Sequence, residues 1–173
     1  MKYGTMGYLV CDKGILMLKK PVRENDPNSG YCVPPGGKLE TFERGLNNLE
    51  GRTSSVVREV EDETGIKLLN PILRGVILFD NKDRTFPNWP NPDNFLVYIF
   101  HSENYSGELK SSNEGVPFWA KDMDEIDSLP KNPGDKKAHE WMRDGRNFFG
   151  VIKHKGNEID EEGTWVDFYA PST

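Results

Sequence analysis

Short apolar runs of strand length open the chain, and turn signals interrupt them. Residues 6–11 and 14–18 are two such runs, with Asp12-Lys13-Gly14 standing at the turn between them. This arrangement predicts a β-hairpin. The charged, asparagine-rich and proline-containing segment 21–30 is typical of a surface loop, and it leads into a short extended piece at 31–33.

The middle of the chain has a helical period and then returns to strand-like runs. A helix is expected over 53–64, with Gly65 as its stop. Its buried side would consist of three valines, Val56, Val57 and Val60. Apolar runs of strand length follow at 72–79 and 95–101. The prolines and asparagines of 80–94 argue against a regular element there, and a long loop of this kind is typical of a functional or mobile segment.

The last third repeats the mixture of strands and helices. A strand is expected at 116–120, a short helical turn at 122–127 and a helix at 136–143, whose buried side would be Ala138, Trp141 and Met142. Residues 148–153 and 164–169 are typical of a closing pair of strands. Mixed elements without an internal repeat indicate an α/β or α+β sandwich, and the length suits a single domain over 1–173.

Composition narrows the function classes. The formal net charge is -6, which disfavours binding to duplex nucleic acid but allows a phosphate substrate if cations screen the site. Cys11 and Cys32 provide neither a disulfide framework nor zinc-ligand spacing, so we expect buried free thiols. No signal-peptide core and no run of about 20 apolar residues occurs, which predicts no membrane association and a cytoplasmic location. The sequence does not determine the oligomeric state, and a homodimer is one alternative.

The expected helix over 53–64 carries an acidic cluster. At about 100° per residue, Glu59, Asp62 and Glu63 lie at relative angles of about 0°, 300° and 40°, on one side of the helix. Neighbouring carboxylates repel one another, and a hard divalent cation reverses the sign of that interaction. Gly36-Gly37 can bring backbone carbonyls close to such an ion. An acidic helix alone is more typical of a solvated face, so the flanking residues decide the interpretation.

Those flanking residues resemble a known motif. The sequence GGKLE, followed downstream by REVEDETGI, is similar to the Nudix box, G-x5-E-x7-R-E-U-x-E-E-x-G-U, in which U is a bulky apolar residue. Asp62 replaces the first of the paired glutamates. The first half carries about seven extra residues in or near 41–48, so either Glu43 or Glu50 is the box glutamate.

The resemblance implies a fold, a cofactor and a set of site residues. The fold would be the Nudix α/β/α sandwich, an α+β arrangement with a mixed central sheet and the box as a loop-helix-loop. The cofactor would be Mg²⁺ or Mn²⁺. Its ligands would be the carboxylates of the helix together with the Gly36 carbonyl, namely Glu59, Asp62, Glu63 and Gly36. Arg58 and Glu50 would form a supporting ion pair.

Further segments resemble the MutT-like branch known as 8-oxo-dGTP diphosphatases. They are NEGVPFW, LPKNPGD, HEWM, NFFGVIKHKG and WVDFY. By that resemblance Glu114 would be a second-metal ligand or a base that orients water, although a loop carboxylate by itself is usually only solvated. Asp135 would contact a purine or, as an alternative of equal weight, cap the following helix. The other substrate-binding candidates are Lys38, Trp89 and Phe86; the two aromatic residues could equally be packing residues.

The implied reaction is metal-assisted attack of water on a phosphoryl group of a nucleotide. A nucleoside triphosphate, in one version an oxidised purine nucleotide, would give a monophosphate and pyrophosphate, with Glu59, Glu63, Glu114, Arg58 and Glu50 as the catalytic set. Two alternatives remain. The first is a pyrophosphatase for ADP-ribose, a nucleotide sugar or another nucleoside diphosphate derivative. The second is a non-catalytic nucleotide-binding module.

Overall fold

The computed structural model describes residues 1–40, 49–85 and 92–170. The strands are β1 (Lys2–Cys11), β2 (Gly14–Lys19), β3 (Cys32–Val33), β4 (Gly36–Lys38), β5 (Ile66–Leu69), β6 (Ile72–Arg84), β7 (Phe95–Ser102), β8 (Asn104–Gly107), β9 (Val116–Ala120), β10 (Asn147–Gly156), β11 (Glu158–Ile159) and β12 (Trp165–Tyr169). The helices are α2 (Leu49–Thr64), α3 (Met123–Ser128) and α4 (Pro133–Asp144). Within these described ranges, no helix has the length and apolar composition needed to cross a bilayer.

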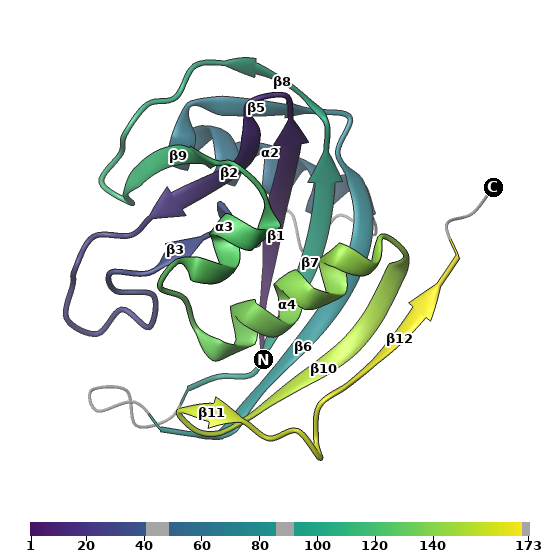
Figure 1. The fold of residues 1–173 in the computed structure, drawn as a ribbon. Helices are drawn as coiled ribbons and strands as arrows, with labels where there is room; N and C mark the ends of the chain where they lie inside the picture. Colours follow the sequence, from purple (N-terminus) through teal and green to yellow (C-terminus); the bar gives the residue numbers. More distant parts are fainter. Residues whose placement is uncertain (41–48, 86–91, 171–173) are drawn as a thin grey trace.

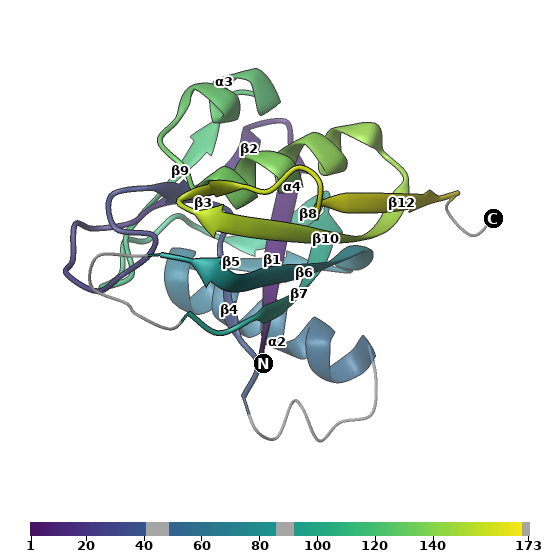
Figure 2. The same cartoon turned by 90° about the horizontal axis from the view of Figure 1, so that it is seen from below.

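A mixed sheet forms the middle layer of the fold. Its strand order is β11-β10-β6-β7-β1-β2-β3, with β12 paired to β10, β4 to β1 and β9 to β2. The β1–β7 and β6–β10 pairs are parallel, whereas β6–β7, β1–β2 and β10–β12 are antiparallel. Figure 1 shows α4 crossing one face of this sheet while α2 lies behind it, and Figure 2 shows the two helices on opposite sides. The expected α+β sandwich with a mixed central sheet is therefore confirmed.

Each face of the sheet has its own hydrophobic core. Under α2 the buried residues are Leu9, Leu16, Val56, Val60, Ile66, Leu68 and Phe100. Under α4 they are Tyr8, Ile77, Phe79, Val97, Ile99, Ala138, Trp141, Phe148 and Ile152. Burial of a large apolar side chain is worth about 1.5–3 kcal/mol, so each helix is held against the sheet by several such contributions. The packing fixes which side of α2 faces the β4 segment.

Local patterns predicted most elements but not all of their ends. The hairpin of β1 and β2 pairs Val10 with Ile15, as the turn signal indicated, and β10 and β12 form the expected closing pair. The helix expected at 53–64 begins earlier, at Leu49, and the one expected at 136–143 begins at Pro133.

Two expectations about these segments were wrong, and the expectation of buried free thiols was confirmed for only one of the two cysteines. The segment expected to be irregular from residue 80 continues β6 to Arg84, because Asp83 and Arg84 pair with β10. Cys32 is a buried free thiol, whereas the free thiol of Cys11 is only partly buried. The cap of α4 is Asn132, and Asp135 lies inside its first turn. Asp135 therefore does not serve as the helix cap.

Candidate active site

Helix α2 presents Glu59 and Glu63 to the β4 segment. The burial of Val56 and Val60 against the sheet sets the rotation of the helix. Glu63 is then 7% exposed, and the Glu59 side chain is 18% exposed. Asp62 is more exposed, with 69% of its side chain accessible, and its Oδ2 lies 3.9 Å from the Arg58 Nη1 atom that also binds Glu59. Glu59 and Glu63 are therefore the covered acids of the predicted cluster, whereas Asp62 lies at its exposed edge.

The carboxylate of Glu63 is largely buried and lies near other charged groups. The Gly36 backbone N–H donates a hydrogen bond of 3.0 Å to Glu63 Oε2. Burial raises the pKa of Glu63 to about 7, although the Gly36 N–H and the Lys20 ammonium act in the opposite direction. Glu59 and Glu114 add to the rise through their negative charge. The sequence indicated a role for the Gly36 carbonyl, whereas the contact with Glu63 is made by the Gly36 N–H.

Glu59 lies directly over Gly37. A Cβ atom at Gly37 would stand 2.2 Å from Glu59 Oε2, so any larger residue would displace the carboxylate. On its other side, Glu59 Oε1 accepts a hydrogen bond of 2.6 Å from Arg58 Nη1, and the same Arg58 atom lies 3.9 Å from Asp62 Oδ2. The two glycines therefore form a backbone cradle that fits around the Glu59 and Glu63 carboxylates.

Glu114 reaches the same region from a loop far along the chain. Its backbone N–H donates to Ser112 Oγ at 3.1 Å, and Ser112 Oγ donates to the Glu63 carbonyl, also at 3.1 Å. The Lys20 ammonium lies 2.9 Å from Glu114 Oε2 and 4.0 Å from Glu63 Oε1. That ammonium lowers the pKa of Glu114. Lys20, which sequence patterns did not single out, thus lies between two of the predicted acids.

The chemistry of this cluster suits a hard divalent cation. Carboxylate and carbonyl oxygens are the ligands that Mg²⁺ and Mn²⁺ prefer. In the described ranges, however, no group of three or more His, Cys, Asp or Glu side chains already stands close enough to hold an ion. Lys20 and Arg58 instead neutralise the acids. The donor set and the glycine cradle therefore fit such an ion.

The remaining predicted residues of the Nudix-like segment lie at its edges. Glu50 is exposed in the first turn of α2, eight residues before Arg58 on one continuous helix. That separation is about 12 Å along the axis, so Glu50 is not placed as the close partner that was expected for Arg58. The competing residue, Glu43, lies outside the described residues. Lys38 is exposed on β4.

A second polar cluster surrounds Asp135 at the start of α4. Asp135 is 8% exposed, and burial raises its pKa to about 6 while Arg84 and Lys131 oppose the rise. Burial lowers the pKa of Arg84 to about 10. Arg84 Nη2 donates a hydrogen bond of 3.0 Å to Asn132 Oδ1. This buried set of donors and acceptors was only partly foreseen, since Asp135 was predicted and Arg84 was not.

One loop contacts both polar clusters. In segment 21–30, Arg23 Nη1 lies 3.9 Å from Glu114 Oε2, and Arg23 also donates to the Asn113 carbonyl. At the other end, Asn132 Nδ2 donates to Asn28 Oδ1 at 2.5 Å. The predicted surface loop therefore connects the carboxylate cluster with the cluster around Asp135. Phe86 and Trp89, the aromatic candidates for base stacking, lie outside the described residues.

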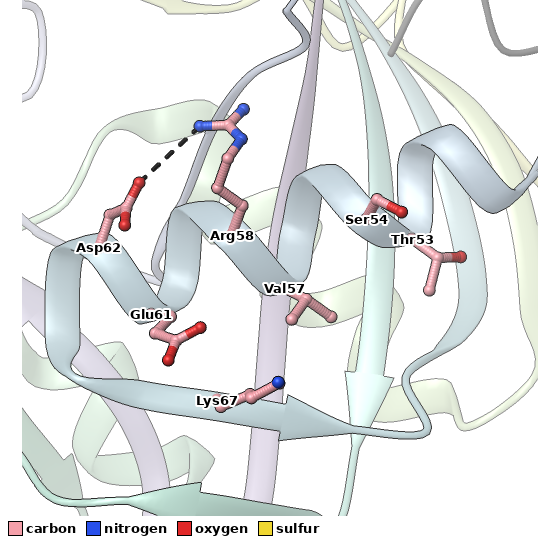
Figure 3. A pocket seen from close by; sticks show the side chains of 7 residues that line it. All are labelled: Thr53, Ser54, Val57, Arg58, Glu61, Asp62 and Lys67. Atoms are coloured by element: carbon pink, nitrogen blue, oxygen red, sulfur yellow. Dashed lines mark ion pairs between the residues drawn. The ribbon is translucent and has the colours of Figure 1, made fainter.

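A hollow of about 370 Å³ lies on the outer side of α2. Figure 3 shows Arg58 and Asp62 at its edge, with Lys67 reaching in from β5. By the helical period, its residues Ser54 and Glu61 are on the side of α2 opposite Glu63. This hollow is therefore separate from the buried carboxylates, and Arg58 borders both.

Comparisons with known proteins agree with the fold and with the box. A family model described as the NUDIX domain matches residues 2–143. The Nudix hydrolase YvcI of Bacillus subtilis (strain 168) is 34% identical over 141 residues, which are 80% of this chain and 77% of that protein. The MutT protein from Bacillus halodurans has a TM-score of 0.74 at 27% identity, with 96% of this chain and 98% of that chain covered.

A more distant structure was solved with a ligand. The NUDIX domain of NrtR from Shewanella oneidensis, in complex with ADP ribose, has a TM-score of 0.62 at 13% identity. The match covers 84% of this chain and 88% of that chain. At this identity the likeness concerns the fold alone.

Proposed function

The chain belongs to the Nudix hydrolase family, and from this premise we propose that it converts a nucleoside triphosphate into a monophosphate and pyrophosphate. The reaction class, hydrolysis of a nucleoside diphosphate derivative by a pyrophosphohydrolase, follows from the family. Water attacks a phosphoryl group, the phosphoanhydride bond breaks, and the leaving phosphate takes the electron pair. The triphosphate substrate, with an oxidised purine as the preferred base, is our finer proposal.

The buried Glu63 carboxylate carries this proposal. The carboxylate is fixed by the Gly36 N–H, and the other two acids, Glu59 and Glu114, influence its charge state. A glutamate carboxylate that is held within hydrogen-bond reach of a water molecule is a common general base. We assign Glu63 the role of accepting or orienting the proton of the attacking water, with Glu114 as the second carboxylate beside it.

Divalent metal fits the same residues. Glu59, Glu63 and Glu114 would hold Mg²⁺ or Mn²⁺, with Asp62 and the Gly36 carbonyl as the additional ligands implied by the box. When bound, the ion supplies charge neutralisation at the phosphate oxygens and makes water more acidic. Arg58 positions Glu59 through their 2.6 Å hydrogen bond. Gly37 leaves the space in which that carboxylate lies.

The cluster at the start of α4 would bind the base. Asp135 and Asn132 offer oxygen acceptors, Asn132 offers an amide donor, and Arg84 offers guanidinium donors. A purine edge that carries both N–H groups and carbonyl oxygens can pair with such a set. Loop 21–30 touches this cluster at Asn28 and the carboxylate cluster at Arg23, which supports one substrate extending between them.

The experiment that tests the proposal is a substrate panel with product identification. Purified protein is incubated with Mg²⁺ or Mn²⁺ and with nucleoside triphosphates, oxidised purine triphosphates, ADP-ribose and nucleotide sugars. We expect monophosphate and inorganic pyrophosphate from a triphosphate, and no turnover when the metal is chelated. Turnover of ADP-ribose in preference to all triphosphates would instead support the nucleotide-sugar class. Nucleotide binding without hydrolysis of any compound would support a non-catalytic module.

Replacing Asp135 with asparagine should increase stability at neutral pH and weaken base selection. Because the folded pKa is raised from 3.8 to about 6, the stability associated with Asp135 is fully present below about pH 4 and is lost as the pH rises through 6. Asparagine does not ionise, so the variant does not lose this stability as the pH rises. At pH 7 we expect Asp135→Asn to be more stable by up to about 3 kcal/mol, since the pKa is raised by roughly two units and one unit is about 1.4 kcal/mol. The opposing effect of the Arg84 charge is already contained in that shift.

The measurement combines denaturant unfolding at pH 4 and pH 7 with kinetics on the panel. The stability difference between variant and wild type should grow from pH 4 to pH 7, while KM for the preferred base rises more than kcat falls. An unchanged preference among bases would remove Asp135 from base recognition.

A further inference from the structure

Lys20 follows β2 and places a largely buried ammonium among the acids of the site. Its side chain is 10% exposed, which is unusual for lysine. The ammonium lies 2.9 Å from Glu114 Oε2 and 4.0 Å from Glu63 Oε1. A buried ammonium is stable only beside a compensating negative charge, and the two carboxylates supply it. Lys20 is therefore held by the same oxygens that our proposed function gives to a metal ion.

Metal and ammonium compete for those oxygens. A divalent cation that binds Glu63 and Glu114 would repel an ammonium at its present distance, so the two cations cannot share the carboxylates equally. The four-carbon stem of lysine is flexible, and its compact charge is a common ligand for phosphate. A substrate polyphosphate beside the metal would provide the negative charge that Lys20 loses.

We propose that Lys20 is an exchangeable counter-ion, which neutralises Glu63 and Glu114 in the metal-free protein and moves to the substrate polyphosphate when a divalent cation binds them. This inference rests on the proposed function. It adds a coupling between the two ligands. Metal binding frees the Lys20 ammonium to bind phosphate, and polyphosphate binding removes that ammonium from the carboxylates that bind the metal. By linkage, each then increases the affinity for the other by the same factor.

The coupling can be measured by calorimetry without turnover. Mn²⁺ is titrated into metal-free protein alone and in the presence of an α,β-methylene analogue of dGTP, and the analogue is titrated with and without Mn²⁺. For Lys20→Met we expect Mn²⁺ alone to bind several-fold more tightly than to wild type. We expect the analogue, with Mn²⁺ present, to bind about tenfold more weakly, within the usual range of coupling factors.

Matched variants separate this role from a structural one. Lys19→Met makes the same change one residue earlier, at an exposed side chain whose ammonium donates to the Gly30 carbonyl, and should leave both affinities near wild type. Lys20→Arg keeps the charge and should recover most of the analogue affinity. It also provides a folded variant if Lys20→Met is unstable, which thermal melting will detect.

The outcomes are distinguishable. Unchanged or weaker Mn²⁺ binding by folded Lys20→Met, or a coupling factor equal to that of wild type, would overturn the exchange while leaving the proposed hydrolysis intact. Failure of the wild-type protein to bind Mn²⁺ under any of these conditions would overturn the proposed function, and the exchange with it.

Discussion

Replacement of Glu63 by glutamine is expected to lower turnover by about two to four orders of magnitude, the usual contribution of a general acid or base. Glutamine can still accept the Gly36 N–H hydrogen bond and occupies nearly the same volume. It can neither take a proton from water nor contribute negative charge to a cation. We therefore expect a large fall in kcat without any fall in melting temperature. Because burial raises the pKa of Glu63 to about 7, the uncharged glutamine should be at least as stable there near neutral pH. Product release from the best substrate of the panel is the measurement.

Glu61 provides the matched control. It lies on the same helix, is exposed, and borders the hollow on the outer side of α2. Glu61→Gln should change turnover by no more than about twofold, since surface substitutions away from special features have small effects. Wild-type turnover in Glu63→Gln would exclude Glu63 from the mechanism. An equal loss in both variants would point to the charge of the helix as a whole.

The elements that could be predicted are those whose signal is local. The hairpin of β1 and β2 follows from two apolar runs and a turn, and the rotation of α2 follows from Val56 and Val60. The same period predicts that Glu59 and Glu63 share a side. Asp62 lies about 60° from Glu59 by the same arithmetic. The position of β4 decides which of the three acids are covered, and a helical period contains no information about β4.

Contacts between distant segments could not be predicted from sequence patterns. Gly36–Lys38 has little strand propensity and becomes β4 only because it pairs with β1. The end of β6 is polar and is held by β10, some seventy residues later. Lys20 meets Glu114 across 94 positions of the chain. A single lysine after a strand is normally solvated, so its burial could be learned only from the structure.

Alanine at each of the two adjacent glycines of the cradle should have a different effect: one should lower activity and the other should lower stability. At Gly37 the added Cβ would stand 2.2 Å from Glu59 Oε2, the far end of a flexible side chain. The carboxylate can move away, so the fold should tolerate the change while the acid leaves its place. We expect kcat/KM to fall by at least about tenfold, the result of losing roughly 1.4 kcal/mol of transition-state stabilisation.

At Gly36 the added Cβ would instead stand 2.1 Å from the Thr5 carbonyl oxygen and 2.8 Å from Met6 Cα, which are backbone atoms of β1. Because Met6 pairs with Gly36 across the β1–β4 ladder, those atoms cannot yield without disturbing the strand pair. Gly36→Ala should therefore lose about 1–3 kcal/mol of stability, the usual consequence of overpacking. Melting temperature and kcat/KM measured on both variants test the contrast. Equal destabilisation, or full activity in Gly37→Ala, would mean that the position of Glu59 over Gly37 is not required for hydrolysis.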